Sequence, residues 1–171
     1  MYVCMYVDCA TWIKRDVEFI NSAAGKAMEW PSANVHSNAK SLGVIAAMMA
    51  NNGRTLQDYQ LLTPEVVKLA MSEPKIDHDK FMGATYSFTK GGFSNFGDFH
   101  SVLTPSDFHK VYNGFSGWCG LGGSLFLWDS SRRVGFTYTM NGKTLQLISG
   151  PRGDRIMKST QKVLSDLKPC S

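Results

Sequence analysis

The sequence predicts an α+β fold, in which helices flank an antiparallel sheet. Strand-forming segments are concentrated between residues 81 and 140, and helical segments lie before and after them. This order favours an antiparallel sheet over alternating strands and helices. With 171 residues, 43% of them hydrophobic and 12% aromatic, the chain can bury a core, and we predict a single domain over residues 1–171.

Helical patterns precede the strands. Residues 14–28 are predicted to be helical. A second helix is predicted between Ser37, which suits the N-cap, and Gly53, which suits a left-handed position after the C-terminus. Its residues are apolar on nearly every side, so we expect this helix to be buried. A third helix is predicted from Pro64, with Thr63 as its N-cap.

The middle of the chain has the pattern of strands. Residues 75–80 are predicted to form a polar loop, and strands are predicted over 81–89 and from His100 up to a glycine-rich stretch. After the strands, residues 154–167 place their apolar side chains on one helical face. They are predicted to form the last helix, with Asp154 near its N-terminus.

The glycine-rich stretch, residues 114–142, is predicted to contain a strand hairpin. Residues 125–128 are all apolar, and over 134–140 large residues alternate with small or polar ones, with a turn at 129–132 between the two segments. The stretch opens on four glycines, namely Gly117, Gly120, Gly122 and Gly123. Bare backbone in a strand often marks a close approach by a ligand or another chain, so we expect a binding partner to contact main chain first.

Composition and motif spacing argue against several classes of protein. The net charge is +4 and no run of lysine and arginine forms a stripe, so we expect no binding to nucleic acid. The longest apolar run, residues 44–50, is far shorter than the roughly 20 residues that a membrane span needs. The cysteines and histidines lack metal-site spacing, and no nucleotide-binding motif is complete. We therefore predict no metal site, no cofactor and no membrane span.

One short motif offers a nucleophile. In Ser-x-x-Lys, a lysine one helical turn away can accept the proton of a serine. The spacing occurs five times, and only Ser37 and Lys40 lie at the start of a helix predicted to be buried. They are the candidates for a new small hydrolase, and the alternative is an N-cap serine beside a surface lysine. The tripeptide at 152–154 matches an adhesion motif, but Asp154 already suits a helix start.

Two longer segments resemble one family. Residues 31–53 (PSANVHSNAKSLGVIAAMMANNG) are similar to a Pro-Ser-Ala-Asn-Gly-His segment followed by a buried, alanine-rich helix. Residues 117–129 (GWCGLGGSLFLWD) are similar to a Gly-His-x-Gly-x-Gly-Gly-Ser segment and its strand, and residues 61–67 and 82–86 follow the expected order between them. On these segments the chain resembles the serine β-lactamase-like hydrolases of the class C and penicillin-binding type, which include related esterases.

The resemblance runs from about residue 30 to residue 171. It implies a partial β-lactamase or transpeptidase-like fold, of which this chain is the C-terminal part. In the family, the Ser-x-x-Lys nucleophile and a Tyr-x-Asn motif precede the Pro-Ser-Ala-Asn segment. Neither motif is in place here, and Ser37 and Lys40 therefore become weak candidates.

The resemblance also implies where a substrate edge would lie. Trp118 stands where the family has a lysine or histidine, Gly120 is retained, and the amide of Leu121 would donate to the oxyanion of a reacting carbonyl. The rest of a glycine-lined cleft would be formed by Gly122, Gly123 and Ser124. The alternative is that these glycines only let the strand pass close to a helix.

The leading interpretation is the C-terminal portion of a β-lactamase-like serine hydrolase. The full-length form would attack a small-molecule ester or amide carbonyl through an acyl-enzyme, whereas this chain is expected to be inactive alone because it lacks the nucleophile segment. The alternative is a non-catalytic relative, in which Trp118 and the glycines bind a ligand or partner. A partial fold leaves strands unpaired, so we also expect association through an uncovered sheet edge.

Overall fold

The structure, a computed structural model, describes residues 18–29, 35–80, 83–101, 107–120, 123–140 and 150–166. The chain divides into two compact units, Met1–Ser37 and Asn38–Ser171. In the first unit, residues 18–21 are helical and α2 (Ala23–Ala27) follows, capped by the Ser22 hydroxyl, which accepts a hydrogen bond from the Gly25 amide. The helix predicted over 14–28 is confirmed within the described residues, with an interruption at Ser22.

The second unit begins with α3 (Ala39–Ala50). Its N-cap is Asn38 rather than Ser37, because the Asn38 Oδ1 accepts a hydrogen bond from the Ser41 amide at 2.9 Å. At the other end Asn52 and Gly53 both have left-handed backbone, with φ of +53° and +85°. The Gly53 amide donates to the Met48 carbonyl at 2.9 Å, which closes the helix as predicted, although Asn52 takes the first left-handed position.

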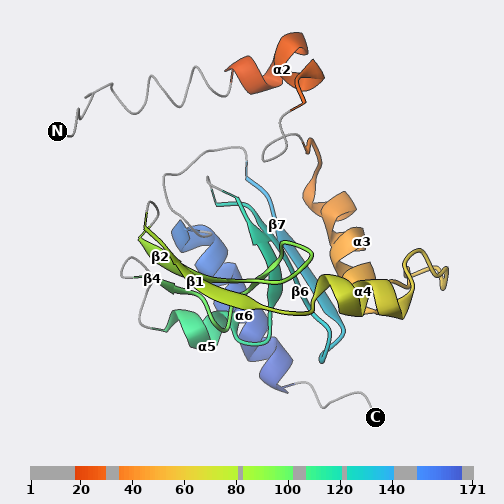
Figure 1. Ribbon diagram of the computed structural model, residues 1–171, viewed down its shortest axis with the longest axis vertical. Helices are drawn as coiled ribbons and strands as arrows, with labels where there is room; N and C mark the ends of the chain where they lie inside the picture. The colour runs from red at the N-terminus through yellow and green to blue at the C-terminus, as the bar shows by residue number, and fades with distance from the viewer. Residues whose placement is uncertain are drawn as a thin grey trace. The chain divides into compact units, whose positions relative to one another are not determined.

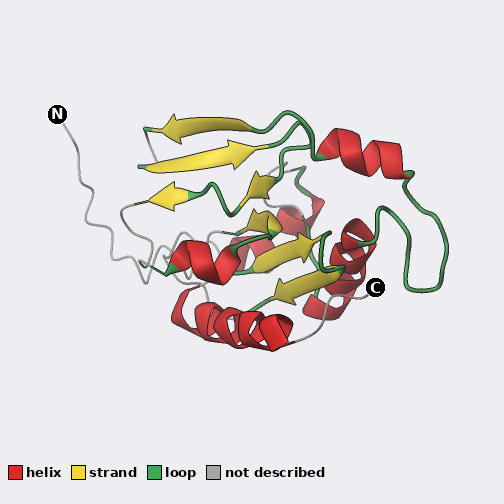
Figure 2. Cartoon of the chain, turned by 90° about the horizontal axis from the view of Figure 1, so that it is seen from below, coloured by secondary structure: helices red, strands yellow, loops and turns green. Residues whose placement is uncertain are grey.

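The sheet is antiparallel throughout. Its strand order is β1-β2-β3-β5-β6-β7, with β4 paired to β2, and Figure 2 shows the strands as a row of arrows of alternating direction. The strands are β1 (Lys75–Asp79), β2 (Ala84–Phe88), β3 (Ser94–Asn95), β4 (His100–Ser101), β5 (Ser116–Cys119), β6 (Leu125–Asp129) and β7 (Val134–Tyr138). The remaining helices are α4 (Pro64–Ala70), α5 (Phe108–Tyr112) and α6 (Gly150–Asp166), as labelled in Figure 1. The predicted α+β class is confirmed, and so is the β6–β7 hairpin.

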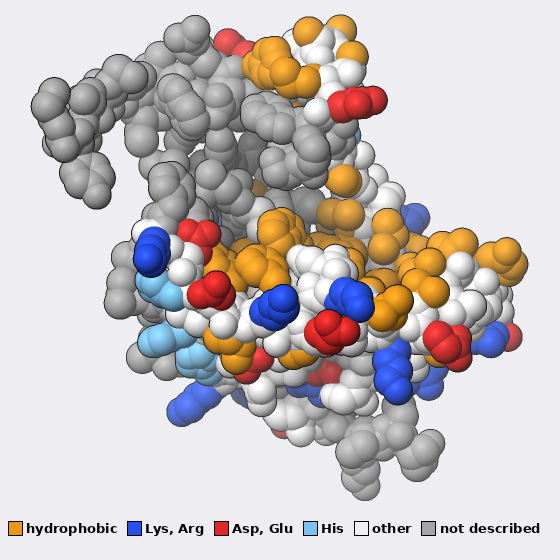
Figure 3. Space-filling view, in the orientation of Figure 1, with side chains coloured by type: hydrophobic (Ala, Val, Ile, Leu, Met, Phe, Trp, Pro, Cys, Tyr) orange, Lys and Arg blue, Asp and Glu red, His pale blue; other side chains and the backbone are white. Residues whose placement is uncertain are grey.

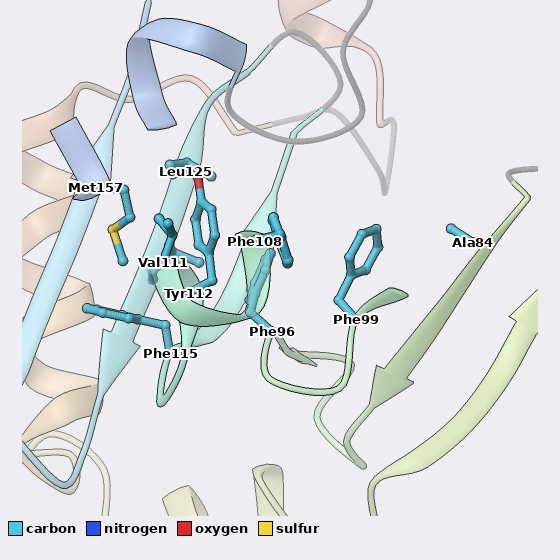
Figure 4. Close-up of a cluster of buried hydrophobic side chains, with 10 residues drawn as sticks. Ala84, Phe96, Phe99, Phe108, Val111, Tyr112, Phe115, Leu125 and Met157 are labelled. Carbon is cyan, nitrogen blue, oxygen red and sulfur yellow. The ribbon is translucent and has the colours of Figure 1, made fainter. Parts of the chain in front are cut away.

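Two hydrophobic clusters lie on opposite faces of the sheet, because alternate residues of β6 enter different clusters. Leu125 and Leu127 belong to the cluster that α5 and α6 cover, part of which is drawn in Figure 4. Trp128 and Phe126 belong to the cluster that α3 and α4 cover. The sheet is therefore the middle layer, with helices on both faces.

The alternation along β7 reflects these two layers. Val134, Phe136 and Tyr138 pack against the α5/α6 cluster, whereas Gly135 and Thr137 face α3. A Cβ atom at Gly135 would lie 2.4 Å from the backbone nitrogen of Ala47, and the Thr137 hydroxyl donates to the Ala39 carbonyl at 2.8 Å. Small residues on this side of β7 thus let α3 pack directly on the strand backbone.

The expectation that α3 is buried on every side is wrong for its N-terminal half. Ala46, Met48, Met49 and Ala50 are buried, but the side chains before them are not. Val44 is 40% exposed and Ile45 is 47% exposed. The sheet covers one side of the helix, and within the described residues no second layer covers the other.

Three other expectations need correction. Residues 75–79 form β1, which pairs with β2 from Lys75 opposite Phe88 onward, where a polar loop was expected. Residues 108–112 form α5 in a region expected to continue as strand. The last helix, α6, begins at Gly150, four residues before Asp154, whose carboxylate accepts a hydrogen bond from the Tyr112 hydroxyl at 2.7 Å. The adhesion-like tripeptide at 152–154 is therefore a part of α6.

Two buried hydroxyls in the sheet, those of Ser87 and Ser94, have no hydrogen-bond partner among the described residues. An unsatisfied buried hydroxyl costs free energy, so Ser87→Ala is expected to raise the free energy of unfolding by about 1 kcal/mol. The matched control is Thr137→Val, which keeps the side-chain shape but removes a hydroxyl that is bonded, and is expected to lower stability by about 1 kcal/mol. Urea denaturation measures both, and a loss of stability in Ser87→Ala would contradict the assignment.

Candidate functional site

The candidate site is the hairpin formed by β5 and β6. Trp118 pairs with Phe126, and Cys119 pairs with Leu125. Beyond the strands, the Gly120 amide donates to the Ser124 carbonyl at 2.9 Å, and the Gly123 amide donates to the Gly120 carbonyl at 3.0 Å. The hairpin is therefore closed by main-chain bonds.

Two of the predicted site residues, Leu121 and Gly122, lie outside the described residues, and the predicted oxyanion donor is one of them. Of the rest of the predicted glycine cleft, Gly123 has a φ of +98° and is buried, and Ser124 is partly buried. A residue with a side chain would be strained in the backbone conformation of Gly123. The Gly120 amide is already bonded within the hairpin, so it is not available to a ligand in this conformation.

The surroundings of Gly120 differ from those of Gly135. Among the described residues, a Cβ at Gly120 would meet only the Ser124 Cβ, at an ordinary contact distance of 3.9 Å, whereas at Gly135 it would collide with α3. Close passage of a helix therefore explains the glycine at 135 and does not explain the one at 120. No described residue comes closer to this position than ordinary contact.

Trp118 forms an aromatic surface with a residue of another strand. Its ring centroid lies 5.8 Å from that of Phe88, which is in turn stacked on Tyr86 at 5.3 Å. Trp118 is 48% exposed and Phe88 is 37% exposed. The sequence pattern did not single out Phe88, since only strand pairing brings it near Trp118.

The edge of β5 is open beside Trp118. On the side away from β6, β5 is paired by the two residues of β3, Ser94 opposite Gly117 and Asn95 opposite Ser116. Beyond Gly117, no strand of the described chain continues this pairing. Among the described residues, this edge of Trp118 and Cys119 therefore has no strand partner.

Cys119 lies on β5 next to Trp118. Burial raises the pKa of Cys119 to about 11. At neutral pH the group is therefore the thiol, and the thiolate that would act as a nucleophile is not formed. We assign no catalytic role to Cys119.

Ser37 and Lys40, the candidates from the Ser-x-x-Lys spacing, are both exposed. Ser37 ends the first compact unit, and Lys40 lies in the first turn of α3 in the second. Activation of a serine by a neighbouring lysine depends on a desolvated lysine. The exposure of both side chains lends this hypothesis no support. The described residues contain no cluster of three or more metal-ligating side chains and no helix with the length and apolar character of a membrane span.

A largely buried ion pair lies in the turn between β6 and β7, at the end of β6 away from Gly120. Asp129, which is 1% exposed, accepts hydrogen bonds from the Ser131 amide and hydroxyl at 2.8 and 2.6 Å and from the Arg132 amide at 3.0 Å. Its second oxygen accepts from the Arg132 Nε at 2.5 Å. Arg132 also donates to the Asn113 carbonyl and the Gln161 side chain, which ties the turn to α6. Burial alone would raise the pKa of Asp129, but the bonds from Ser131 and Arg132 together lower it below its ordinary value.

The fold is similar to that of known solved structures. A scan against models of protein families and a search of curated proteins gave no match. Among solved structures, the fold is similar to that of a family VIII carboxylesterase, with a TM-score of 0.69 and 23% identity over 86% of this chain and 37% of that one. It is also similar to a penicillin-binding protein homolog from Caulobacter crescentus, with a TM-score of 0.67 and 27% identity over 83% of this chain and 36% of that one.

Both structures have the serine β-lactamase-like fold. This chain therefore carries a part of the serine β-lactamase-like fold, as the resemblance over residues 30–171 predicted. The chain spans a little over a third of the length of each of the two structures, at 37% and 36%.

Proposed function

We propose that the chain is the C-terminal portion of a β-lactamase-like serine hydrolase whose complete form attacks a small-molecule ester or amide carbonyl through an acyl-enzyme. The observation that carries this proposal is the fold similarity to a carboxylesterase and a penicillin-binding protein homolog over only about a third of their lengths. In such a protein this chain supplies the sheet, its substrate edge and part of the core. The nucleophile comes from chain outside the matched part.

Uncovered surfaces in the second unit support a role as part of a larger fold. The side of α3 that bears Val44 and Ile45 has no covering layer among the described residues. The outer edge of β7 has no strand partner in the described part of the chain either. Unpaired strand edges and exposed apolar helix faces are surfaces on which further polypeptide packs. We propose that a further strand of the complete protein pairs with this edge of β7.

The substrate edge is residues 118–121. A tryptophan cannot hold a substrate carboxylate by charge, so Trp118 contributes an aromatic wall together with Phe88. The Leu121 amide is the proposed donor to the oxyanion, because a backbone donor at that position does not depend on the side chain. The lack of a close contact at Gly120 within the described residues supports this role.

The 171-residue chain alone is expected to show no acyl-transfer activity. Upstream of residue 31 it contains no Ser-x-x-Lys, and Ser37 and Lys40 are exposed. The purified chain is therefore expected to remain unlabelled by a fluorophosphonate probe that reacts with active-site serines. Labelling that disappears in Ser37→Ala would contradict the proposal and assign the nucleophile to Ser37.

A non-catalytic relative, or pseudoenzyme, is the second candidate, and Trp118 in place of a basic residue is the observation that favours it. In that case Trp118 and the glycines around Gly120 bind a ligand or a partner. The gene sequence upstream of Met1 separates the two candidates. A Ser-x-x-Lys followed by a Tyr-x-Asn in frame is expected for the hydrolase, whereas a start codon at Met1 with neither motif before it favours the binding protein.

A further inference from the structure

The loop between α3 and α4 displays apolar side chains on a rigid frame. The Thr55 amide donates to the Tyr59 carbonyl at 2.8 Å, and the Leu61 amide donates to the Gly53 carbonyl at 3.0 Å. Arg54 and Asp58 form an ion pair at 2.9 Å across the loop. The main-chain bonds tie the two ends of the loop together, and its large apolar side chains project from that frame.

Large apolar side chains are exposed on this loop and on the helix that follows. They are Leu56 (71%), Tyr59 (66%) and Leu61 (59%) in the loop, with Val66 (47%) and Leu69 (54%) on α4. Figure 3 shows hydrophobic side chains gathered over α3, α4 and this loop. Monomeric proteins rarely expose large apolar side chains in such a group, and exposed apolar patches of this kind mark interaction surfaces.

The exposed face of α4 is self-complementary. At 100° per residue, Glu65 and Lys68 lie on one flank of the exposed face, Val66 and Leu69 lie on the other, and the buried Val67 points the opposite way. An antiparallel second copy of the helix brings Glu65 opposite Lys68 of the second copy. The same two-fold brings the apolar flanks of the two copies together, with Val66 beside Val66 of the second copy.

We propose that the exposed face of α4, extended by the loop before it, is a two-fold interface between two copies of this chain. A two-fold interface uses the same patch on both subunits, and the pattern on α4 pairs charges of opposite sign on one flank and apolar side chains on the other. The exposed tyrosine and leucines of the loop add apolar area beside the helix pair. None of the residues of this interface is among those proposed for the hydrolase site or the β7 edge.

The test reverses one charge at a time. The wild-type chain is expected to sediment as a dimer in sedimentation velocity over a micromolar concentration series at low salt. Lys68→Glu places a second carboxylate opposite Glu65 of the other copy, at both ends of the interface. We expect the dissociation constant to rise about tenfold or more, because two attractive pairs become two repulsive ones. Glu65→Lys is expected to act in the same way.

Mixing the two variants makes the test specific to the register. Equal amounts of Lys68→Glu and Glu65→Lys restore opposite charges across a heterodimer, so the mixture is expected to dimerise about as tightly as wild type. The control is Lys162→Glu on the exposed face of α6, which is expected to leave the dissociation constant unchanged. Circular dichroism verifies that each variant is folded.

Two results would overturn the proposal. One is a wild-type chain that stays monomeric throughout the concentration series. The other is a dimer that responds equally to Lys68→Glu and Lys162→Glu, or that is not restored in the mixture. If the dimer responds equally to the two variants, or is not restored in the mixture, the chain associates through another surface, such as the outer edge of β7. The result is distinguishable from a failure of the hydrolase proposal, because no step of the test depends on activity.

Discussion

Asp129→Asn is expected to lower the free energy of unfolding by about 3 kcal/mol, because it removes the charge that compensates the Arg132 guanidinium in a largely buried network. The Asp129 side chain is 2% exposed and makes four hydrogen bonds with residues 131 and 132. An asparagine amide cannot accept all of them, and one of its atoms becomes a donor that faces other donors. Urea denaturation of the two proteins measures the difference.

The matched control is Asp58→Asn. Asp58 also pairs with an arginine, at 2.9 Å, but its side chain is 85% exposed. Exposed pairs contribute little, so the expected loss is below about 0.5 kcal/mol. Equal losses in the two variants would refute the assignment of Asp129 as a buried anchor of the hairpin.

The same network predicts a dependence on pH. The folded-state pKa of Asp129 lies below its ordinary value of about 4, so its contribution is complete above that value and is lost as the pH falls through the lowered one. Stability measured from pH 6 down to pH 2 is therefore expected to fall less steeply in Asp129→Asn than in wild type. Parallel curves for the two proteins would contradict a lowered pKa.

Gly135→Ala is expected to lower the free energy of unfolding by about 2 kcal/mol. The new Cβ would lie 2.4 Å from the Ala47 nitrogen and 2.7 Å from the Ala46 carbonyl carbon, which are backbone atoms that no rotamer change can move. Either α3 shifts away from β7 or the strand bends, and both changes loosen the packing of the hydrophobic cluster between them. Guanidinium denaturation measures the loss.

Gly120→Ala is the control, since it makes the same chemical change at a position without a close neighbour. The new Cβ would meet the Ser124 Cβ at 3.9 Å, an ordinary contact. Because alanine also restricts the unfolded chain, this variant is expected to be unchanged or up to about 1 kcal/mol more stable. A large loss at Gly120 would instead support the alternative that the glycines of the hairpin serve close packing.

Local signals predicted much of the fold. Thr63 and Pro64 mark the start of α4, and the alternation over 134–140 marks β7. These signals work because they depend on neighbours in the chain, such as a side chain that caps an amide three residues on. The β6–β7 hairpin was likewise predictable, because its two strands flank a short turn and pair with their nearest neighbour in the chain.

Other elements had no such signal. β1 is a strand whose five residues are all exposed, so its side chains show no apolar alternation, and main-chain pairing with β2 alone makes it a strand. In α5, Phe108, Val111 and Tyr112 are buried, but five residues are too few to establish a helical period. Both elements depend on contacts that are distant in the sequence.

The sequence by itself determined the fold class, the family resemblance and the position of Trp118 and Gly120 in a glycine-rich segment, because these follow from local pattern and motif order. Only the tertiary structure decided that the Phe88 ring lies beside Trp118 and that α3 packs against Gly135 rather than Gly120. It also decided that α3 and α4 each leave an apolar face exposed. The physical reason is that packing depends on which faces of distant segments meet. A helix such as α3, apolar on nearly every side, has a composition suited to two covering layers, and the fold alone shows that the described chain provides one of them.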